Sequence, residues 1–179
     1  MIYEELYIND LYLIKPKIYK DNRGFFFESF KNSDFKKNIY DASFIQENQS
    51  YSKKGTLRGL HFQKYPFEQS KLVSCIYGEI LDVAVDLRKD SNTFKSHYSV
   101  KLNSINNHKL FIPKGFAHGF IVLSDFAIVS YKIDNKYMKS HESGIIYNDK
   151  ELNIDWILNE SEIITSEKDK KLNNLKNEI

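Results

Sequence analysis

A mainly β fold, an antiparallel sandwich or barrel, is predicted by three features of this 179-residue sequence. Its middle part contains many short apolar runs that alternate with a period of two, as half-buried strands do. Tight turns join these runs, and antiparallel strands joined by tight turns form sandwiches or barrels. Hydrophobic residues make up 41% of the chain and charged residues 28%, a composition typical of folded proteins. The length favours one domain over residues 1–179.

Composition and charge also exclude several classes of protein. The only cysteine, Cys75, cannot form an internal disulfide framework or a cysteine-based zinc site, and it fits the reducing cytoplasm. No apolar run approaches the length of a membrane span, and the acidic N-terminal segment lacks the basic region of a signal peptide. The net charge is +2 and the lysines are scattered. We therefore expect a cytoplasmic protein with neither a nucleic-acid partner nor a membrane partner.

In chain order, the first predicted element is a short helix from about Ser33 to Tyr40. Residues 71–90 then alternate in a period of two around a turn at Gly78 and Glu79. The strand after this turn has two different faces. The acidic face carries Ile80, Asp82, Ala84, Asp86 and Arg88, and the apolar face carries Leu81, Val83, Val85 and Leu87.

Two further strands and a C-terminal helix follow. A turn at residues 113–115 precedes a strand whose shared face carries Phe116, His118, Phe120 and Val122. The next strand places Ala127, Val129 and Tyr131 on a common face. Residues 166–179 are predicted to be helical, because Asp169, Leu172 and Ile179 fall near one stripe and Ser166 with Asp169 matches a capping box.

The segment 46–63 is the most unusual one, because Arg58, His61 and Gln63 surround Gly59 in a stretch otherwise suited to a strand. Strand parity places Arg58 and His61 on opposite faces. Both side chains can point into one cavity only if Gly59 marks a β-bulge, which is a common use of glycine within strands.

His61 and His118 are the first candidates for chemistry. Each histidine alone is best explained as a hydrogen-bonded interior residue. If both lie on strands that line one cavity, a functional site explains them as well as an interior position does. Metal sites in barrels usually combine two histidines one residue apart with a carboxylate, and this sequence has no His-x-His. His97, His108 and His141 lie in polar, loop-like segments where we expect them to be solvated. We therefore expect no catalytic metal.

Acid-base chemistry is the second possibility, since histidine titrates near neutrality and a carboxylate can orient it and stabilise its charged form. Asp169 is a candidate for that carboxylate, although the helix cap accounts for it as well. Lys71, Arg58 and Arg23 could receive an anionic substrate or could be ordinary solvated charges. Tyr131 is by default a core aromatic. The residue pattern by itself leaves these alternatives open.

Seven blocks of the sequence carry a resemblance to a known family. They are DNRGFFFESF (21–30), QENQSYSKKGTLRGLHFQ (46–63), KLVSCIYGEILDVAVDLRKDSNTF (71–94), FIPKGFAHGFIVLS (111–124), YKIDNKY (131–137), ESGIIYND (142–149) and ITSEKD (164–169). In order and spacing, from about Tyr12 to Leu172, they resemble the nucleotide-sugar 3,5-epimerases typified by dTDP-4-dehydrorhamnose 3,5-epimerase. Any one block is weakly specific, whereas all seven together are highly specific.

The resemblance implies a cupin-type jelly-roll barrel with short flanking helices and without the usual metal or any other cofactor. It implies a homodimer whose N-terminal strands cross to the partner. The expected activity is an isomerase that epimerises C3, C5 or both in a nucleotide-linked 4-keto-6-deoxysugar, foremost dTDP-4-dehydro-6-deoxyglucose to dTDP-4-dehydrorhamnose. Such an enzyme would serve dTDP-rhamnose biosynthesis for cell-surface polysaccharides.

The same resemblance implies catalytic roles. His61 is the base that removes a proton beside the 4-keto group, Asp169 orients it, and Tyr131 occupies the place of the proton donor on the opposite face. Lys71, with His118 nearby, stabilises the enolate oxygen. This set is chemically reasonable, because inversion needs proton transfer on two faces and a ketone-activated C–H needs preplaced donors at the developing oxyanion.

Substrate-binding positions are also implied. Arg58 would hold the phosphates, since a planar guanidinium engages two phosphate oxygens at once. Other positions that match family contacts to the ligand, some of them across the dimer, are Arg23, Glu28, Gln46, Glu47, Asn48, Glu142 and Lys168. The chain departs from the family pattern at residues 147–150, residues 156–157, Lys139 and the loop 64–70. These departures leave the nucleotide and the sugar open.

Two alternatives follow. One is a 3- or 5-mono-epimerase, or a 3,5-epimerase of a GDP- or CDP-linked 4-keto sugar or heptose. The other is a carbohydrate- or nucleotide-binding jelly roll without turnover. A binding module has no need for His61, Tyr131, Lys71 and Asp169 together, which favours the enzyme.

Overall fold

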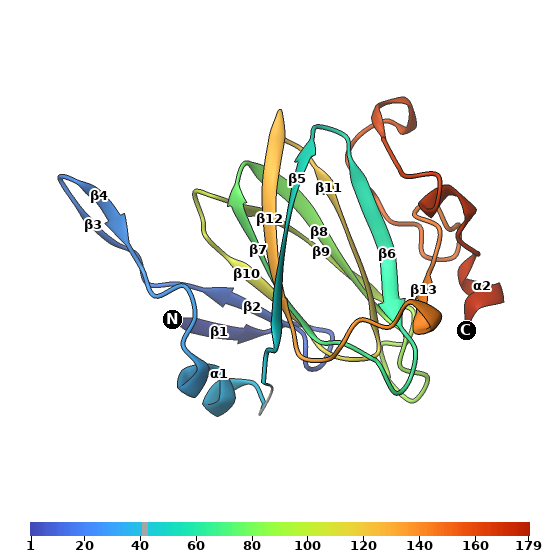
Figure 1. The fold of residues 1–179 in the computed structure, drawn as a ribbon, viewed down its shortest axis with the longest axis horizontal. Helices are drawn as coiled ribbons and strands as arrows, with labels where there is room; N and C mark the ends of the chain where they lie inside the picture. The colour runs from blue at the N-terminus through green and yellow to red at the C-terminus, as the bar shows by residue number, and fades with distance from the viewer. Residues whose placement is uncertain (41–42) are drawn as a thin grey trace.

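Two antiparallel β-sheets face each other in the computed structural model, which describes residues 1–40 and 43–179 (Figure 1). In spatial order, the six-stranded sheet contains β1 (Ile2–Glu5), β2 (Tyr12–Lys15), β10 (Lys109–Ile112), β7 (Lys71–Tyr77), β12 (Phe126–Ile133) and β5 (Gln46–Lys53). The five-stranded sheet contains β13 (Glu142–Gly144), β6 (Leu57–Gln63), β11 (Phe116–Val122), β8 (Glu79–Asp86) and β9 (His97–Asn103). This arrangement confirms the predicted mainly β fold.

Short elements flank the two sheets. A hairpin of β3 (Tyr19–Asp21) and β4 (Gly24–Phe26) extends away from them (Figure 1). The helical elements are α1 (Asn32–Asn38), η1 (Lys139–His141), η2 (Glu160–Glu162), η3 (Asp169–Lys171) and α2 (Leu175–Glu178). Helix α1 agrees with the predicted helix near residues 33–40. Within the described ranges, no helix is long and apolar enough to cross a membrane.

The alternating patterns correctly predict which side chains share a face of each strand, and the structure shows which of these faces lies between the sheets. Phe116, Phe120 and Val122 of β11 and Val129 of β12 belong to the core between them. Strands β8 and β11 are buried on both faces, because further chain covers the far side of their sheet. The acidic face of β8 is therefore an interior surface, and Asp82 on it is completely buried.

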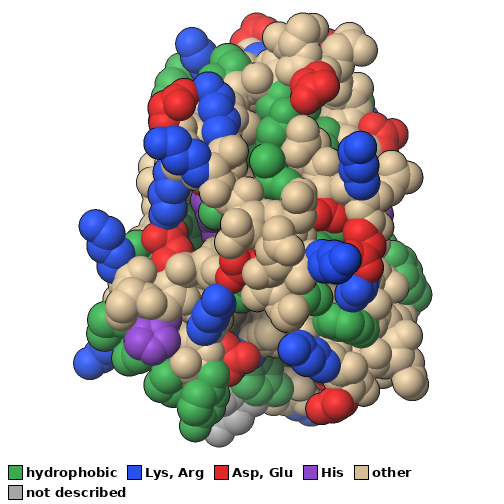
Figure 2. All heavy atoms as spheres, turned by 90° about the vertical axis from the view of Figure 1, so that its right-hand side faces the viewer, with side chains coloured by type: hydrophobic (Ala, Val, Ile, Leu, Met, Phe, Trp, Pro, Cys, Tyr) green, Lys and Arg blue, Asp and Glu red, His purple; other side chains and the backbone are tan. Residues whose placement is uncertain are grey.

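The outer faces of both sheets are partly covered by the chain's two ends. Residues from the C-terminal segment pack on the five-stranded sheet in one cluster that includes Ile145, Leu152, Trp156 and Leu175 together with Leu57, Val83, Ala117 and Ile121. Helix α1 covers part of the six-stranded sheet, with Phe35 packed against Leu72 and Phe111. Figure 2 shows that basic side chains are interspersed with acidic ones over the face that includes the C-terminal segment.

The prediction of one helix over residues 166–179 is wrong. The chain forms only η3 and the four-residue α2, and it is extended between them at Leu172 and Asn174. The reason is tertiary: the backbone N–H of Leu175 donates to the carboxylate of Asp149, and the carbonyl of Asn173 accepts from the N–H of Ile146. These bonds dock the segment on its neighbours instead of leaving it to complete its own helix.

A β-bulge interrupts the pairing of β6 with β11. His61 pairs with His118 and Arg58 pairs with Phe120, so three steps along β6 match two along β11. The extra residue lies at Gly59, which has φ +128° and lies against the backbone of Gly119. The bulge considered from the sequence is thus confirmed.

Replacement of Gly59 by alanine is expected to destabilise the protein by about 2–4 kcal/mol, from overpacking and from left-handed backbone strain. The added Cβ would lie 2.5 Å from the Gly119 Cα and 2.8 Å from the His118 carbonyl oxygen, and neither backbone atom can move aside cheaply. Urea unfolding measures the loss. Gly24→Ala is the matched control, because Gly24 has φ +136° with nothing within 4 Å of its added Cβ. Equal losses in both variants would contradict the close-approach explanation.

Candidate active site

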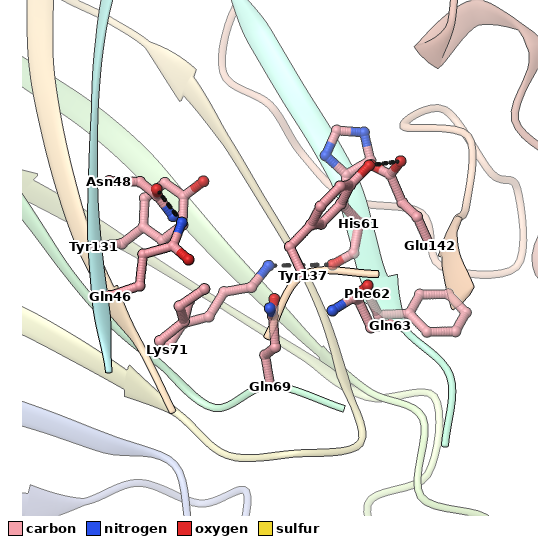
Figure 3. Close-up of a pocket in the computed structure, with 11 residues that line it drawn as sticks. Gln46, Asn48, His61, Phe62, Gln63, Gln69, Lys71, Tyr131, Tyr137 and Glu142 are labelled. Atoms are coloured by element: carbon pink, nitrogen blue, oxygen red, sulfur yellow. Dashed lines mark hydrogen bonds between the residues drawn. The ribbon is translucent and has the colours of Figure 1, made fainter. Parts of the chain in front are cut away.

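A cavity of two adjoining chambers opens between the sheets, with volumes of about 330 and 490 Å³. His61, Lys71 and Tyr131 line both chambers and mark the point where they meet. Figure 3 shows Tyr131 and His61 on opposite sides of the first chamber, with the Lys71 side chain between them. His61 comes from the five-stranded sheet, whereas Tyr131 and Lys71 come from the six-stranded sheet.

The β-bulge explains how neighbouring parts of β6 serve one cavity. Arg58 and His61 both line the second chamber, although a regular strand would direct them to opposite faces. His118 lines the same chamber and is the register partner of His61 on β11. The structure therefore brings Arg58 and the two histidines together as the sequence analysis considered.

His61 and Asp169 form a hydrogen-bonded pair, with 2.8 Å between His61 Nε2 and Asp169 Oδ1. Burial acts to raise the pKa of Asp169, but the hydrogen bond and charge of His61 outweigh it and hold the pKa below its ordinary value. The carboxylate is therefore ionised at neutral pH and accepts the Nε2 proton, and in the neutral form of the ring this bond leaves the lone pair on Nδ1. Ser166 Oγ accepts the Asp169 backbone N–H, which is one half of the predicted capping box, but the residue that flanks η3 is Lys168 and the Asp169 side chain contacts His61.

A second histidine–aspartate pair lies deeper, where His118 Nε2 is 2.7 Å from Asp82 Oδ1. Burial lowers the pKa of His118 despite the opposing charge of Asp82, so the ring favours the neutral form. A neutral ring that donates Nε2–H to Asp82 has no second N–H to offer an oxyanion. The alternating pattern predicts Asp82 on the acidic face of its strand but does not identify it as the partner of His118.

Lys71 and Tyr131 respond to the same buried environment in opposite directions. Burial lowers the pKa of Lys71 to about 8, although the negative charges of Asp82 and Glu142 favour its ammonium form. Burial raises the pKa of Tyr131, which keeps its hydroxyl protonated at neutral pH. Tyr131 is thus able to donate a proton, and Lys71 is a cation whose charge is sensitive to mildly alkaline pH.

The two chambers differ in the polar groups on their walls. Arg58 and Lys168 supply cationic groups to the second chamber. The first is lined by the side-chain amides of Gln46, Asn48, Gln63 and Gln69. An ion pair of 2.6 Å between Lys168 and Glu142 links the two walls, and the Tyr137 hydroxyl donates to the other oxygen of Glu142 (Figure 3). Tyr137, Gln63 and Gln69 were not identified as site residues from the sequence.

Three predicted binding residues lie away from this cavity within the chain. Arg23 is in the turn of the β3–β4 hairpin, where its side chain is 85% exposed and pairs with Asp21. Glu28 follows β4 and lines neither chamber. Glu47 accepts hydrogen bonds from Ser130 and Lys132 and lines a separate hollow beside Phe30 and Phe44.

The other three histidines of the chain line neither chamber. His97, His108 and His141 are half-buried, and His97 is the first residue of β9, so the expectation that all three are solvated in loop-like segments is only partly correct. Burial lowers the pKa of His97 and of His108. In the part of the chain that the structure describes, no group of three or more histidine, cysteine or carboxylate side chains could hold a metal ion.

Comparison with known proteins gives consistent matches over nearly the whole chain. A family model described as dTDP-4-dehydrorhamnose 3,5-epimerase matches residues 5–177. The dTDP-4-dehydrorhamnose 3,5-epimerase of Escherichia coli strain K12 is 46% identical over 166 residues, which cover 92% of this chain and 89% of that protein.

Two solved structures illustrate the structural similarity. The dTDP-4-dehydrorhamnose 3,5-epimerase from Elizabethkingia anophelis has a TM-score of 0.95 and 43% identity, covering 99% of this chain and 97% of its own. The dTDP-6-deoxy-D-glucose-3,5-epimerase from Legionella pneumophila was solved in complex with dTDP-4-keto-L-rhamnose. It has a TM-score of 0.93 and 44% identity, covering 98% of this chain and 93% of its own.

Replacement of Asp169 by asparagine is expected to lower the Tm at neutral pH, with a difference from wild type that shrinks below about pH 4. The native pKa of Asp169 lies below its ordinary value, so its stabilising contribution is present above the unfolded-state pKa and is lost as the pH falls through the native pKa. Thermal unfolding at a series of pH values measures this difference. Asp155→Asn, at an exposed carboxylate, is the control. A pH-independent difference would contradict the expectation.

Proposed function

This chain belongs to the dTDP-4-dehydrorhamnose 3,5-epimerase family, and we propose that residues 1–179 act as one catalytic domain that inverts C3 and C5 of dTDP-4-keto-6-deoxyglucose. The protein is an isomerase of dTDP-rhamnose biosynthesis with a cupin-like β fold. The Legionella relative's complex with dTDP-4-keto-L-rhamnose supports a dTDP-linked sugar as the ligand. The single cysteine is in keeping with a cytoplasmic location.

The observation that carries this proposal is the placement of a base and an acid on facing sheets. His61 and Tyr131 reach the cavity from opposite sheets, and Lys71 lies between them (Figure 3). Inversion of a carbon needs removal of a proton from one face and delivery of a proton to the other. A pair of this kind performs that task for each carbon beside the ketone in turn, because C3 and C5 both flank C4.

In the proposed reaction, His61 Nδ1 takes the proton from the carbon, and the electron pair of the C–H bond becomes the enolate double bond as the C4 carbonyl oxygen gains negative charge. Asp169 fixes the ring and stabilises the imidazolium that forms. Tyr131 then gives its hydroxyl proton to the opposite face of the same carbon, and the enolate collapses back to the ketone. Before the next cycle, His61 releases its extra proton to solvent and Tyr131 takes up a proton from solvent.

Stabilisation of the enolate oxygen is assigned chiefly to Lys71. Its ammonium group is buried in a site of low dielectric constant, where a charge placed in advance acts strongly on a developing oxyanion. His118 lines the same chamber but favours the neutral form, in which its one N–H is bonded to Asp82. It can donate a hydrogen bond to the enolate oxygen only when the ring binds a second proton.

The diphosphate is assigned to the cations of the second chamber, Arg58 and Lys168. Lys168 is held in the structure by Glu142, a contact that neutralises the lysine until an anionic ligand competes for it. Gln46 and Asn48 supply amides to the first chamber, where uncharged groups of the nucleotide or sugar can be bound.

A homodimer with exchange of N-terminal strands is proposed for the working enzyme. The β3–β4 hairpin carries Phe25 and Phe26, which are 56% and 66% exposed, as expected of a segment that packs against another subunit. Arg23 and Glu28, on and beside this hairpin, would then reach the partner's substrate. Glu47 on the outer face of the six-stranded sheet would lie near the subunit boundary.

Deuterium incorporation from deuterated water tests the reaction and its two-face mechanism. The wild type is expected to convert dTDP-4-keto-6-deoxyglucose to the product with deuterium at both C3 and C5. His61→Asn should lose exchange by roughly 100- to 10,000-fold, as expected when a general base is removed. Tyr131→Phe should still exchange protons through His61 but mainly with retention, because it lacks the donor on the opposite face. NMR and mass spectrometry distinguish these products.

The other outcomes are equally informative. A single deuteron in the wild type would mark a mono-epimerase, and reaction only with GDP- or CDP-linked sugars would correct the nucleotide. Binding without exchange would mark a binding module. Inversion of both carbons at the wild-type rate by Tyr131→Phe would show that another group or a water supplies the second face.

The pH dependence of turnover tests the role of Lys71. Because burial lowers the pKa of Lys71 to about 8, the ammonium form is lost as the pH rises through that value, and kcat is expected to fall with it. Lys71→Met should be slower by roughly 100- to 1,000-fold, as for loss of one oxyanion donor, and should lack this alkaline decline. An alkaline decline that persists unchanged in Lys71→Met would assign it to another group.

A further inference from the structure

Two loops form one end of the first chamber, and side chains rather than strand pairing hold them together. We call residues 64–70, directly before β7, and residues 134–138, directly after β12, the mouth loops. Hydrogen bonds from side chains to backbone carbonyls join them: from Asn135 to Pro66 and Glu68, and from Gln69 to Asn135. Gln63, the last residue of β6, bridges them by donating to the carbonyls of Phe67 and Lys136. The mouth loops thus form a connected unit at the point where β7 begins.

Asp134 is the carboxylate that ties this unit to the strand carrying Lys71. Its Oδ1 accepts the backbone N–H of Ser70 at 2.7 Å, and its Oδ2 accepts the Tyr40 hydroxyl at 2.7 Å. Only 5% of its side chain is exposed, and Oδ2 also lies 3.5 Å from the ammonium group of Lys114. Ile133 is the register partner of Lys71 in the β12–β7 ladder, so the bond to Ser70 adds one more rung. A carboxylate replaces a backbone carbonyl in that rung.

The side chain of Lys71 has little else to fix it. Its Nζ lies 3.5 Å from the His61 carbonyl oxygen, which is the long limit of a hydrogen bond. Four rotatable bonds separate the ammonium group from the backbone. The charges of Asp82 and Glu142 act on it, but neither forms an ion pair with it within 4 Å. The position of the ammonium group therefore depends on where the first residue of β7 is held.

We propose that Asp134 is a positioning residue for the epimerisation, acting through Lys71: its hydrogen bond to the Ser70 amide fixes the start of β7 and thereby the ammonium group. The proposal rests on the function assigned above, in which Lys71 stabilises the enolate. Asp134 lines neither chamber, so it acts through the backbone and not on the substrate. A displacement of about 1 Å at a reacting group can cost up to roughly 100-fold in rate.

Three substitutions separate hydrogen bonding from charge at this position. Asp134→Ala removes the acceptor, and kcat is expected to fall about tenfold or more with a smaller change in KM. Asp134→Asn retains the oxygen that accepts from Ser70 and can donate to Tyr40, so it should restore kcat nearly to wild type. Asp134→Glu retains the charge but displaces it by one methylene, so it should remain slow. A fast glutamate variant with a slow asparagine variant would overturn the proposal.

A double-mutant cycle tests whether Asp134 acts through Lys71. In the Lys71→Met background, Asp134→Ala is expected to cost no further activity, because the group that it positions is already absent. An equal loss in both backgrounds would overturn the positioning role while leaving the proposed function intact. Wild-type turnover by Lys71→Met would instead remove Lys71 from the proposed mechanism, and the role of Asp134 would be rejected with it.

Amide hydrogen exchange gives a readout that needs no activity. Exchange of the segment around Ser70 and Lys71, measured by mass spectrometry, should accelerate in Asp134→Ala and remain at the wild-type rate in Asp134→Asn. Asp86→Ala is the matched control, since it removes another buried carboxylate, bonded to Arg88 and lining neither chamber. It should lower Tm without changing exchange near Ser70. Unchanged exchange in Asp134→Ala would overturn the proposal.

Discussion

The close approach of two backbones at Gly59 and Gly119 is the constraint on which the cavity depends. A Cβ at Gly59 would lie 2.5 Å from the Gly119 Cα, and a Cβ at Gly119 would lie 2.9 Å from the Arg58 carbonyl oxygen. Only glycine lets the two strands meet in this way. The bulge that results turns Arg58 and His61 toward the same chamber. In a regular strand, the proposed phosphate ligand and the proposed base would face opposite sides of the sheet.

Burial then gives the neighbouring ionisable groups different tasks. Because low dielectric disfavours charge, it keeps the Tyr131 hydroxyl protonated and makes the Lys71 ammonium easier to deprotonate. Asp169 is the contrasting case, since the adjacent His61 overcomes the effect of burial and the carboxylate remains ionised. One desolvated cavity therefore holds a protonated hydroxyl, a cation that is lost at mildly alkaline pH and a carboxylate that is ionised at neutral pH.

Features of the fold that depend on neighbouring residues, such as strand faces and the bulge, are predictable from the sequence. Alternation correctly groups the side chains that share a face on β8, β11 and β12, and Gly59 indicates the bulge, but which face of β8 lies between the sheets follows only from the structure. Asp169 could not be distinguished from a helix cap by spacing, because its partner His61 lies 108 residues away and the contact depends on how the C-terminal segment docks. The pairing of Asp82 with His118 and of Asp134 with Ser70 depends on strand register in the same way. A single helix over residues 166–179 is not formed, and only η3 and α2 are helical there, because hydrogen bonds to Asp149 and Ile146 compete for the same backbone.

The C-terminal segment couples the covering of one sheet to the geometry of the cavity. It covers the outer face of the five-stranded sheet, and it also places Asp169 2.8 Å from His61. Because one docked segment makes both contacts, its local release would expose the apolar face of the sheet and separate the proposed base from its carboxylate at the same time. The order of the site and the integrity of the sheet are therefore expected to rise and fall together.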